Sequence, residues 1–184
     1  DSLVTASGSS MTFADVSEPQ IVVNTGLNAT FRDVSLLRIN KNTFDIKENA
    51  ILNLETDVTF ELSENITFNN GLFKLTGDDN VCHFRGIGGQ KKLIYLAASV
   101  ANPPGFDLSA NTLMLEDIDF SGLKYVTKSE KTVNNTVVVG SIGLLGGSIV
   151  NIENDTDMNF VIQGSGHELH LLKNDISLNG KIIF

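Results

Sequence analysis

The chain has 184 residues, of which 41% are hydrophobic and 19% are charged, and its net charge is −9. This composition supports one sizeable core, and the acidic balance argues against a nucleic-acid partner, which requires a basic surface. The longest apolar stretch, Val137 to Val150, is too short and too rich in glycine to cross a bilayer, so we expect no membrane insertion.

Residues 1–30 are less periodic than the rest of the chain and are predicted to form an N-terminal edge or cap segment. From residue 31 onward a short phrase recurs: an apolar residue, a few polar residues, an apolar-x-apolar triplet and usually a glycine. The clearest copies are LSENITFNNG (Leu62–Gly71), LEDIDFSG (Leu115–Gly122) and LKNDISLNG (Leu172–Gly180). Each copy is a short strand pattern bounded by turn residues, and repetition of such a unit is typical of a solenoid.

The spacing of the strand centres indicates the length of the repeat. Steps of 23 or 24 residues separate the members of two series, which are Val34, Val58 and Val81, and then Val138, Val161 and Phe184. The interval between the two series is longer than a whole number of steps. We assign the extra residues to 97–110, which contain the strong turn signal Pro103-Pro104-Gly105. We therefore predict that residues 31–184 form an all-β parallel β-helix of about six coils of about 23 residues, with one loop insertion at 97–110. Short strands at this spacing also fit a β-sandwich or jelly roll, which remains the alternative fold.

Alternation along the strands predicts which side chains face the core. The inward set is Ile51, Leu54, Val58, Phe60, Leu62, Ile66, Phe68, Leu72 and Leu75, and the outward set is Asn53, Thr59, Glu61, Thr67 and Lys74. Cys82, the one cysteine, is expected to be a small buried hydrophobe. Residues 91–101 fit either a helix or a buried strand, and glycine and asparagine are expected at the corners of the coils.

The chain finishes on the apolar phrase KIIF (Lys181–Phe184), in the middle of a strand pattern. Natural solenoids cover their last coil, and an uncovered strand edge invites pairing with another chain. We therefore expect a fragment of a longer solenoid, or self-association through this C-terminal coil.

At phrases such as LMLEDIDFSG (Leu113–Gly122), the sequence resembles the right-handed parallel β-helix superfamily, and in particular the passenger domains of bacterial autotransporters and surface adhesins. GGSIV (Gly146–Val150) is similar to the GGA-[ILV] repeat of the chlamydial polymorphic outer-membrane proteins, with Ser148 in place of alanine and no clean F-x-x-N elsewhere. The resemblance implies an extracellular or cell-surface role that is often adhesive. The same superfamily includes enzymes that cleave polysaccharides, so the resemblance also implies enzymatic relatives.

Most of the sequence motifs of polysaccharide-cleaving β-helix enzymes are absent from this chain. Asp78-Asp79 and Gly166-His167-Glu168 are fragments of the polygalacturonase motifs, but N-T-D and R-I-K do not occur. We therefore predict no catalytic and no cofactor-binding residue. The alternative function, a polysaccharide-processing β-helix or a phage or virus tail module, gains support if acidic side chains converge in one groove. The residues concerned are Asp78, Asp117, Asp119, Asp155 and Asp157.

Asp155, Asp157 and Asn159 form the start of a calcium-loop pattern. The pattern then fails, because Phe160 stands where glycine is needed and Gly166 where the closing glutamate is needed. These three residues are a candidate for a weak surface calcium site, and otherwise form an outward polar row.

The favoured function is a structural or adhesive surface module that binds a protein or a glycan. Loops on rigid scaffolds often carry binding function, so the insertion is the candidate binding loop, with Asn102, Pro103, Pro104, Gly105 and Phe106 at its tip. Deletion of residues 97–110 is expected to leave the β-sheet circular dichroism intact and to weaken binding.

Overall fold

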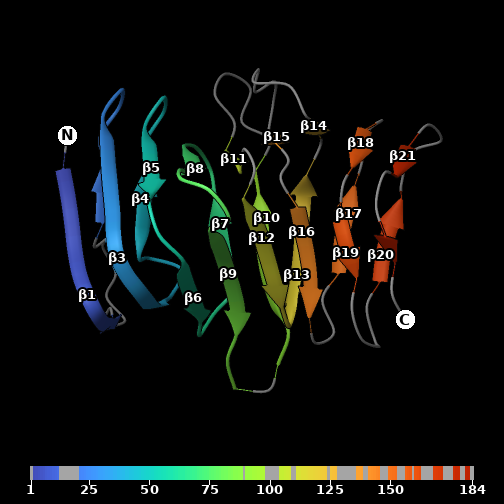
Figure 1. Ribbon diagram of the computed structural model, residues 1–184, viewed down its shortest axis with the longest axis horizontal. Helices are drawn as coiled ribbons and strands as arrows, with labels where there is room; N and C mark the ends of the chain where they lie inside the picture. The colour runs from blue at the N-terminus through green and yellow to red at the C-terminus, as the bar shows by residue number, and fades with distance from the viewer. Residues whose placement is uncertain are drawn as a thin grey trace.

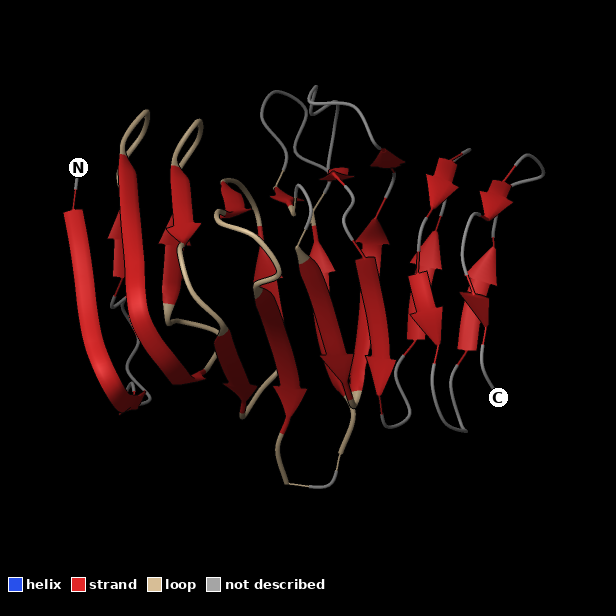
Figure 2. Ribbon diagram, viewed as in Figure 1, coloured by secondary structure: helices blue, strands red, loops and turns tan. Residues whose placement is uncertain are grey.

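The computed structural model describes the backbone of residues 2–12, 21–88, 90–97, 104–108 and 111–123 and of nine short strands between residues 125 and 182. Side chains are described for 21–88, 90–97, 104–108 and 111–122. Strands and turns make up all of these residues, and no helix occurs among them (Figure 2). The strands stack along the long axis of the molecule as a β-solenoid (Figure 1). In the described part of the chain, no helix is long and apolar enough to span a membrane.

The coils have three sides, which we name A, B and C. The long strand β3 bends around the corner between sides A and B, because its first half pairs with β5 and its second half with β6. Every strand pair that the structure describes is parallel, including β1 with β3. A jelly roll or sandwich is antiparallel, so the alternative fold is wrong and the parallel solenoid is confirmed.

The strand bounds follow the three sides. The strands of side A are β5 (Ile51–Leu54), β8 (Leu72–Leu75), β11 (Gly105–Asp107), β15 (Thr136–Val138) and β14 (Tyr125–Thr127). The strands of side B are β6 (Val58–Leu62), β9 (Val81–Gly86), β12 (Thr112–Glu116), β16 (Ser141–Leu145), β19 (Phe160–Ile162) and β22 (Lys181–Ile182). The strands of side C are β7 (Ile66–Phe68), β10 (Lys92–Leu96), β13 (Ile118–Leu123), β17 (Ile149–Ile152) and β20 (Glu168–Leu171). β1 (Ser2–Thr12) and β3 (Asn28–Ile39) join sides A and B, and two further pairs are β2 (Ile21–Val23) with β4 (Phe44–Ile46) and β18 (Thr156–Met158) with β21 (Ile176–Leu178).

The coils are unequal in length. Along side B the partner residues Leu36, Thr59, His83, Met114, Gly143 and Val161 are 23, 24, 31, 29 and 18 residues apart. The first steps confirm the predicted repeat, but the later 23-residue series is wrong, because it joins Val138 on side A to Val161 on side B. Strands on all three sides are described in four coils, which are β5 to β7, β8 to β10, β11 to β13 and β15 to β17. The solenoid thus has about four complete turns, fewer than the six predicted.

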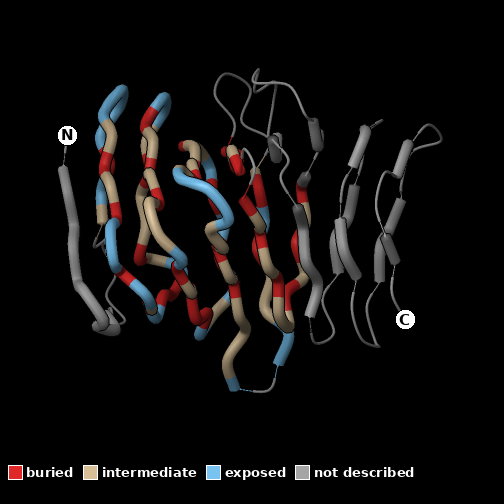
Figure 3. Tube along the Cα trace, in the orientation of Figure 1, coloured by how far each residue is buried: buried red, intermediate tan, exposed pale blue. Residues whose placement is uncertain are grey.

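Phenylalanine side chains fill the interior and stack from coil to coil. Phe60 stacks on Phe84 with ring centroids 4.9 Å apart, and Phe73 stacks on Phe106 at 5.0 Å. Both pairs are also direct partners in the strand register. Figure 3 shows the resulting alternation of buried and more exposed residues along strands such as β5, β8 and β12. Cys82 is fully buried among these side chains, as predicted, and burial raises the pKa of its thiol.

Three of the predicted orientations are wrong. Leu52 and Phe73 are fully buried, whereas Ile51 and Leu72 are only half-buried. Each pair consists of two adjacent apolar residues, so the alternation alone left the inward member undetermined. Glu61 was predicted to face water, but it is buried because arginines from both neighbouring coils cover it.

Residues 97–110 do not form one continuous loop. The chain returns to side A at β11, where the amide of Gly105 donates a hydrogen bond to the carbonyl oxygen of Gly71 (3.1 Å). Phe106 pairs with Phe73 and is fully buried. Residues 91–101 contain β10, which confirms the strand interpretation over residues 92–96. The expected effect of the deletion is therefore also wrong, since removing residues 97–110 would remove β11 and part of the core.

Candidate functional site

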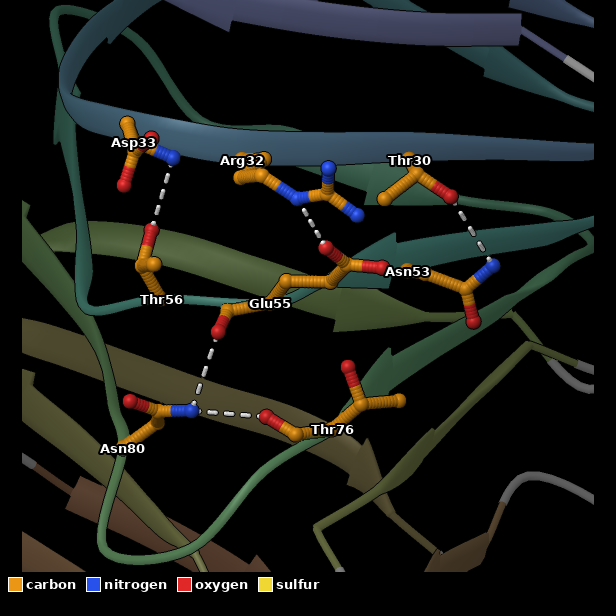
Figure 4. Close-up of polar contacts among 8 residues, drawn as sticks. All are labelled: Thr30, Arg32, Asp33, Asn53, Glu55, Thr56, Thr76 and Asn80. Atoms are coloured by element: carbon orange, nitrogen blue, oxygen red, sulfur yellow. Dashed lines mark hydrogen bonds and ion pairs between the residues drawn. The ribbon is translucent and has the colours of Figure 1, made fainter. Parts of the chain in front are cut away.

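Polar side chains on the outer surface connect each coil to the next. Figure 4 shows this at the corner between sides A and B, where Arg32 pairs with Glu55 and the amide of Asp33 donates to Thr56 Oγ1 at 3.0 Å. Asn53 Nδ2 lies 3.5 Å from Thr30 Oγ1 in the same two coils. These contacts join residues 23 positions apart, which is one coil. They therefore hold successive coils in register.

Asparagine side chains continue this role at the same corner in the next coils. Asn80 Nδ2 donates to the carbonyl oxygens of Glu55 (3.2 Å) and Thr76 (2.6 Å) (Figure 4). The fully buried Asn111 accepts the amide hydrogen of Asn80 at 2.8 Å and donates to the carbonyl oxygen of Gly77 at 3.2 Å. The expected placement of asparagine at a corner is thus confirmed at Asn80, and both side chains bond from coil to coil.

A row of alternating charge crosses side B. Arg38, Glu61, Arg85 and Glu116 are successive partners in the strand register. Glu61 accepts hydrogen bonds from Arg38 (2.8 Å) and from Arg85, and its side chain is only 8% exposed. Beside this row, His83 Nε2 lies 3.1 Å from Glu116 Oε2, and burial is the main cause that lowers the pKa of His83.

The two arginines lower the pKa of Glu61 below its ordinary value of 4.5, chiefly through the hydrogen bond from Arg38. A depressed carboxyl pKa stabilises the fold above the unfolded-state pKa, and this contribution is lost as the pH falls through the folded-state value. We expect Glu61→Gln to lower the free energy of unfolding at pH 7 by about 1–2 kcal/mol. The difference from the wild type should shrink below about pH 4.5, as measured by urea unfolding at several pH values.

Glu55→Gln is the matched control, because it breaks the more exposed pair with Arg32 in the same wall. Exposed ion pairs contribute about 0–1 kcal/mol, so its effect at pH 7 should be the smaller of the two. A Glu61→Gln deficit that stays constant from pH 7 to pH 3.5 would contradict the role of the two arginines.

One outer surface was not identified from the sequence. Tyr95 on β10 is the one exposed aromatic side chain among those that the structure describes, with 40% of its surface accessible. It lies on side C between Thr67 and Ser121, its partners on the neighbouring strands. The signal was present in KLIYL, where Ile94 and Leu96 alternate with Tyr95. The sequence fitted either a helix or a buried strand here, and neither interpretation singles out Tyr95 as exposed.

The candidate binding loop is placed only in part. Pro104, Gly105 and Phe106 are buried, and Phe106 is a core residue that no partner can contact. These three residues belong to the wall of the solenoid, so their assignment to an exposed binding tip is wrong. Asn102 and Pro103 lie outside the described residues.

The calcium candidate lies almost entirely outside the described residues. Asp157 is on β18, where it pairs with Ser177, while Asp155 and Asn159 are not described. Where side chains are described, no group of three or more histidine, cysteine, aspartate or glutamate residues is arranged to hold a metal ion.

The described acidic side chains do not share one strand face. Asp78 is exposed in the turn between β8 and β9, Asp117 lies in the turn between β12 and β13, and Asp119 is on β13. Asp78 thus lies at the corner of sides A and B, and the other two on or beside side C. The grouping that would favour a polysaccharide-cleaving enzyme is not formed by these three residues.

Comparison of the chain with models of protein families, with curated proteins and with solved structures gives no match. The function is therefore argued from the solenoid and its surfaces.

Proposed function

We propose that this chain is a structural and adhesive module, a rigid β-solenoid whose outer faces bind a protein or glycan partner. The observation that supports this most directly is how its charged side chains are used. Arg32, Arg38, Lys74 and Arg85 on the strands each pair with a carboxylate of an adjacent coil. Charged side chains that pair between coils suit a scaffold, and faces that are already formed suit binding without rearrangement of the protein.

The resemblance of the coil phrases to autotransporter and surface-adhesin passengers extends this proposal. On that basis we place the module outside the cell or at its surface, as part of a larger β-helical protein. Self-association through the C-terminal coil stays part of the same proposal. Neither the calcium candidate nor a cofactor is required by it.

The whole chain, coupled to beads, is expected to bind cultured epithelial cells or immobilised glycans in a saturable manner. It should release no reducing ends from polygalacturonate or from mixed heteroglycans. The heat-unfolded chain on the same beads is the control for non-specific adsorption. Production of reducing ends would favour the enzymatic alternative, and the absence of saturable binding to either surface would overturn the proposed function.

A further inference from the structure

The outer surface of side C presents two rows of side chains around one exposed aromatic ring. Tyr95 lies in the strand register between Thr67 on β7 and Ser121 on β13. In the adjacent row, Leu93 pairs with Asp119, and its amide donates a hydrogen bond to Asn65 Oδ1 at 2.8 Å. An aromatic ring thus has hydroxyl, amide and carboxylate groups on the neighbouring strands of the same sheet.

The edge of the Tyr95 ring lies close to Gly122. A Cβ atom at Gly122 would lie 2.9 Å from Tyr95 Cε2 and 2.3 Å from the carbonyl oxygen of Leu96, and the φ angle of Gly122 is +81°. The missing side chain leaves the space that the edge of the ring occupies. A ring that is already supported in this way loses little conformational entropy when a ligand packs on it.

The polar neighbours of the ring are ordered by contacts of their own. Ser121 Oγ donates to Asp119 Oδ1 at 2.6 Å, and the bond from Leu93 holds the Asn65 amide. A carboxylate accepts several hydrogen bonds, and a hydroxyl both donates and accepts.

This combination fits a sugar better than other ligands. A pyranose ring offers a face of C–H groups that packs on an aromatic ring, while its hydroxyls bond to carboxylate, amide and hydroxyl groups. A lipid surface or an apolar peptide requires a contiguous apolar patch, and here Tyr95 is flanked by polar side chains. Asp119 and the net charge of −9 disfavour anionic sugars.

We propose that the surface of side C formed by Asn65, Thr67, Leu93, Tyr95, Asp119 and Ser121 binds a neutral carbohydrate, with a sugar ring packed on Tyr95. This inference rests on the proposed binding function and names the class of partner and its site. It places recognition on a strand face rather than on the 97–110 insertion.

Binding of the whole chain to cellohexaose, chitohexaose and mannohexaose by titration calorimetry tests the proposal. Tyr95→Ala should weaken binding of the recognised sugar at least about tenfold, and Tyr95→Phe should keep it within about threefold, because the ring remains. Val22→Ala is the matched control, since Val22 is an exposed apolar residue on the distant strand β2. Circular dichroism and the melting temperature of each variant should equal those of the wild type.

The outcomes separate this inference from the proposed function. Carbohydrate binding that survives Tyr95→Ala would overturn the Tyr95 site and leave the adhesive function standing. Saturable binding to cells without binding to any of the three sugars would likewise overturn the carbohydrate class alone. Absence of binding to both cells and sugars would overturn the proposed function itself.

Discussion

Phe73→Ala is expected to lower the free energy of unfolding by about 3–5 kcal/mol, since Phe73 is fully buried at the centre of the aromatic stack. The centroid of its ring lies 5.0 Å from that of Phe106, 4.7 Å from that of Phe68 and 6.0 Å from that of Phe44. Removal of the ring therefore opens a cavity between three coils. Urea unfolding followed by circular dichroism measures the loss. Amide hydrogen exchange should show faster opening at β5, β8 and β11, because a solenoid is stabilised by contacts between nearest coils.

Leu72→Ala is the matched control, because Leu72 precedes Phe73 in the chain and points to the opposite face of β8. It is half-buried, so we expect a loss of about 1 kcal/mol or less. Equal losses from the two substitutions would mean that the register of β8 is shifted by one residue.

Gly71→Ala is expected to cost about 2–5 kcal/mol, combining left-handed backbone strain with overpacking. Gly71 has a φ angle of +89°, and a Cβ atom there would lie 2.2 Å from Ile46 Cγ2. The corner before β8 is therefore packed directly against β4 of the preceding coil. A thermal unfolding scan of the variant should show a clear drop in the melting temperature.

Gly26→Ala separates the two causes. Gly26 also has a positive φ angle, of +71°, but nothing lies within 4 Å of the position its Cβ would occupy. We expect a loss of about 1–2 kcal/mol from backbone strain alone. If Gly71→Ala were no worse than Gly26→Ala, the close approach of Ile46 to the corner would be refuted.

The repeating coil could be predicted from the sequence because each strand and corner carries local signals. Gly71 and Gly77 have positive φ angles at the expected corners, whereas Gly122 has its positive φ angle inside strand β13. Phe60 and Phe68 are buried as expected. Other corners use aspartate in the left-handed conformation, as at Asp33 and Asp79. Short polar side chains tolerate this conformation, so composition alone does not distinguish them.

The remaining features depend on contacts between coils, which a single sequence does not display. Leu52 rather than Ile51 is buried because Leu52 pairs with Phe73 in the next coil. Glu61 is covered only because Arg38 and Arg85, 23 and 24 residues away, reach it from opposite sides. Tyr95 is exposed because its position in the alternation is set by Ile94 and Leu96, whose side chains face the core.

Among the described side chains, the alternating row on side B leaves the excess of negative charge to other parts of the surface. Cations and anions cancel along that wall, whereas exposed carboxylates of Asp33, Asp57, Asp78 and Asp79 lie at the corner between sides A and B. Uncompensated surface charge sets the long-range field that guides diffusional encounter, and salt screens it over about 10 Å at 0.1 M. A basic partner would therefore first approach this edge of the solenoid, and its association rate, rather than its final affinity, would depend on ionic strength.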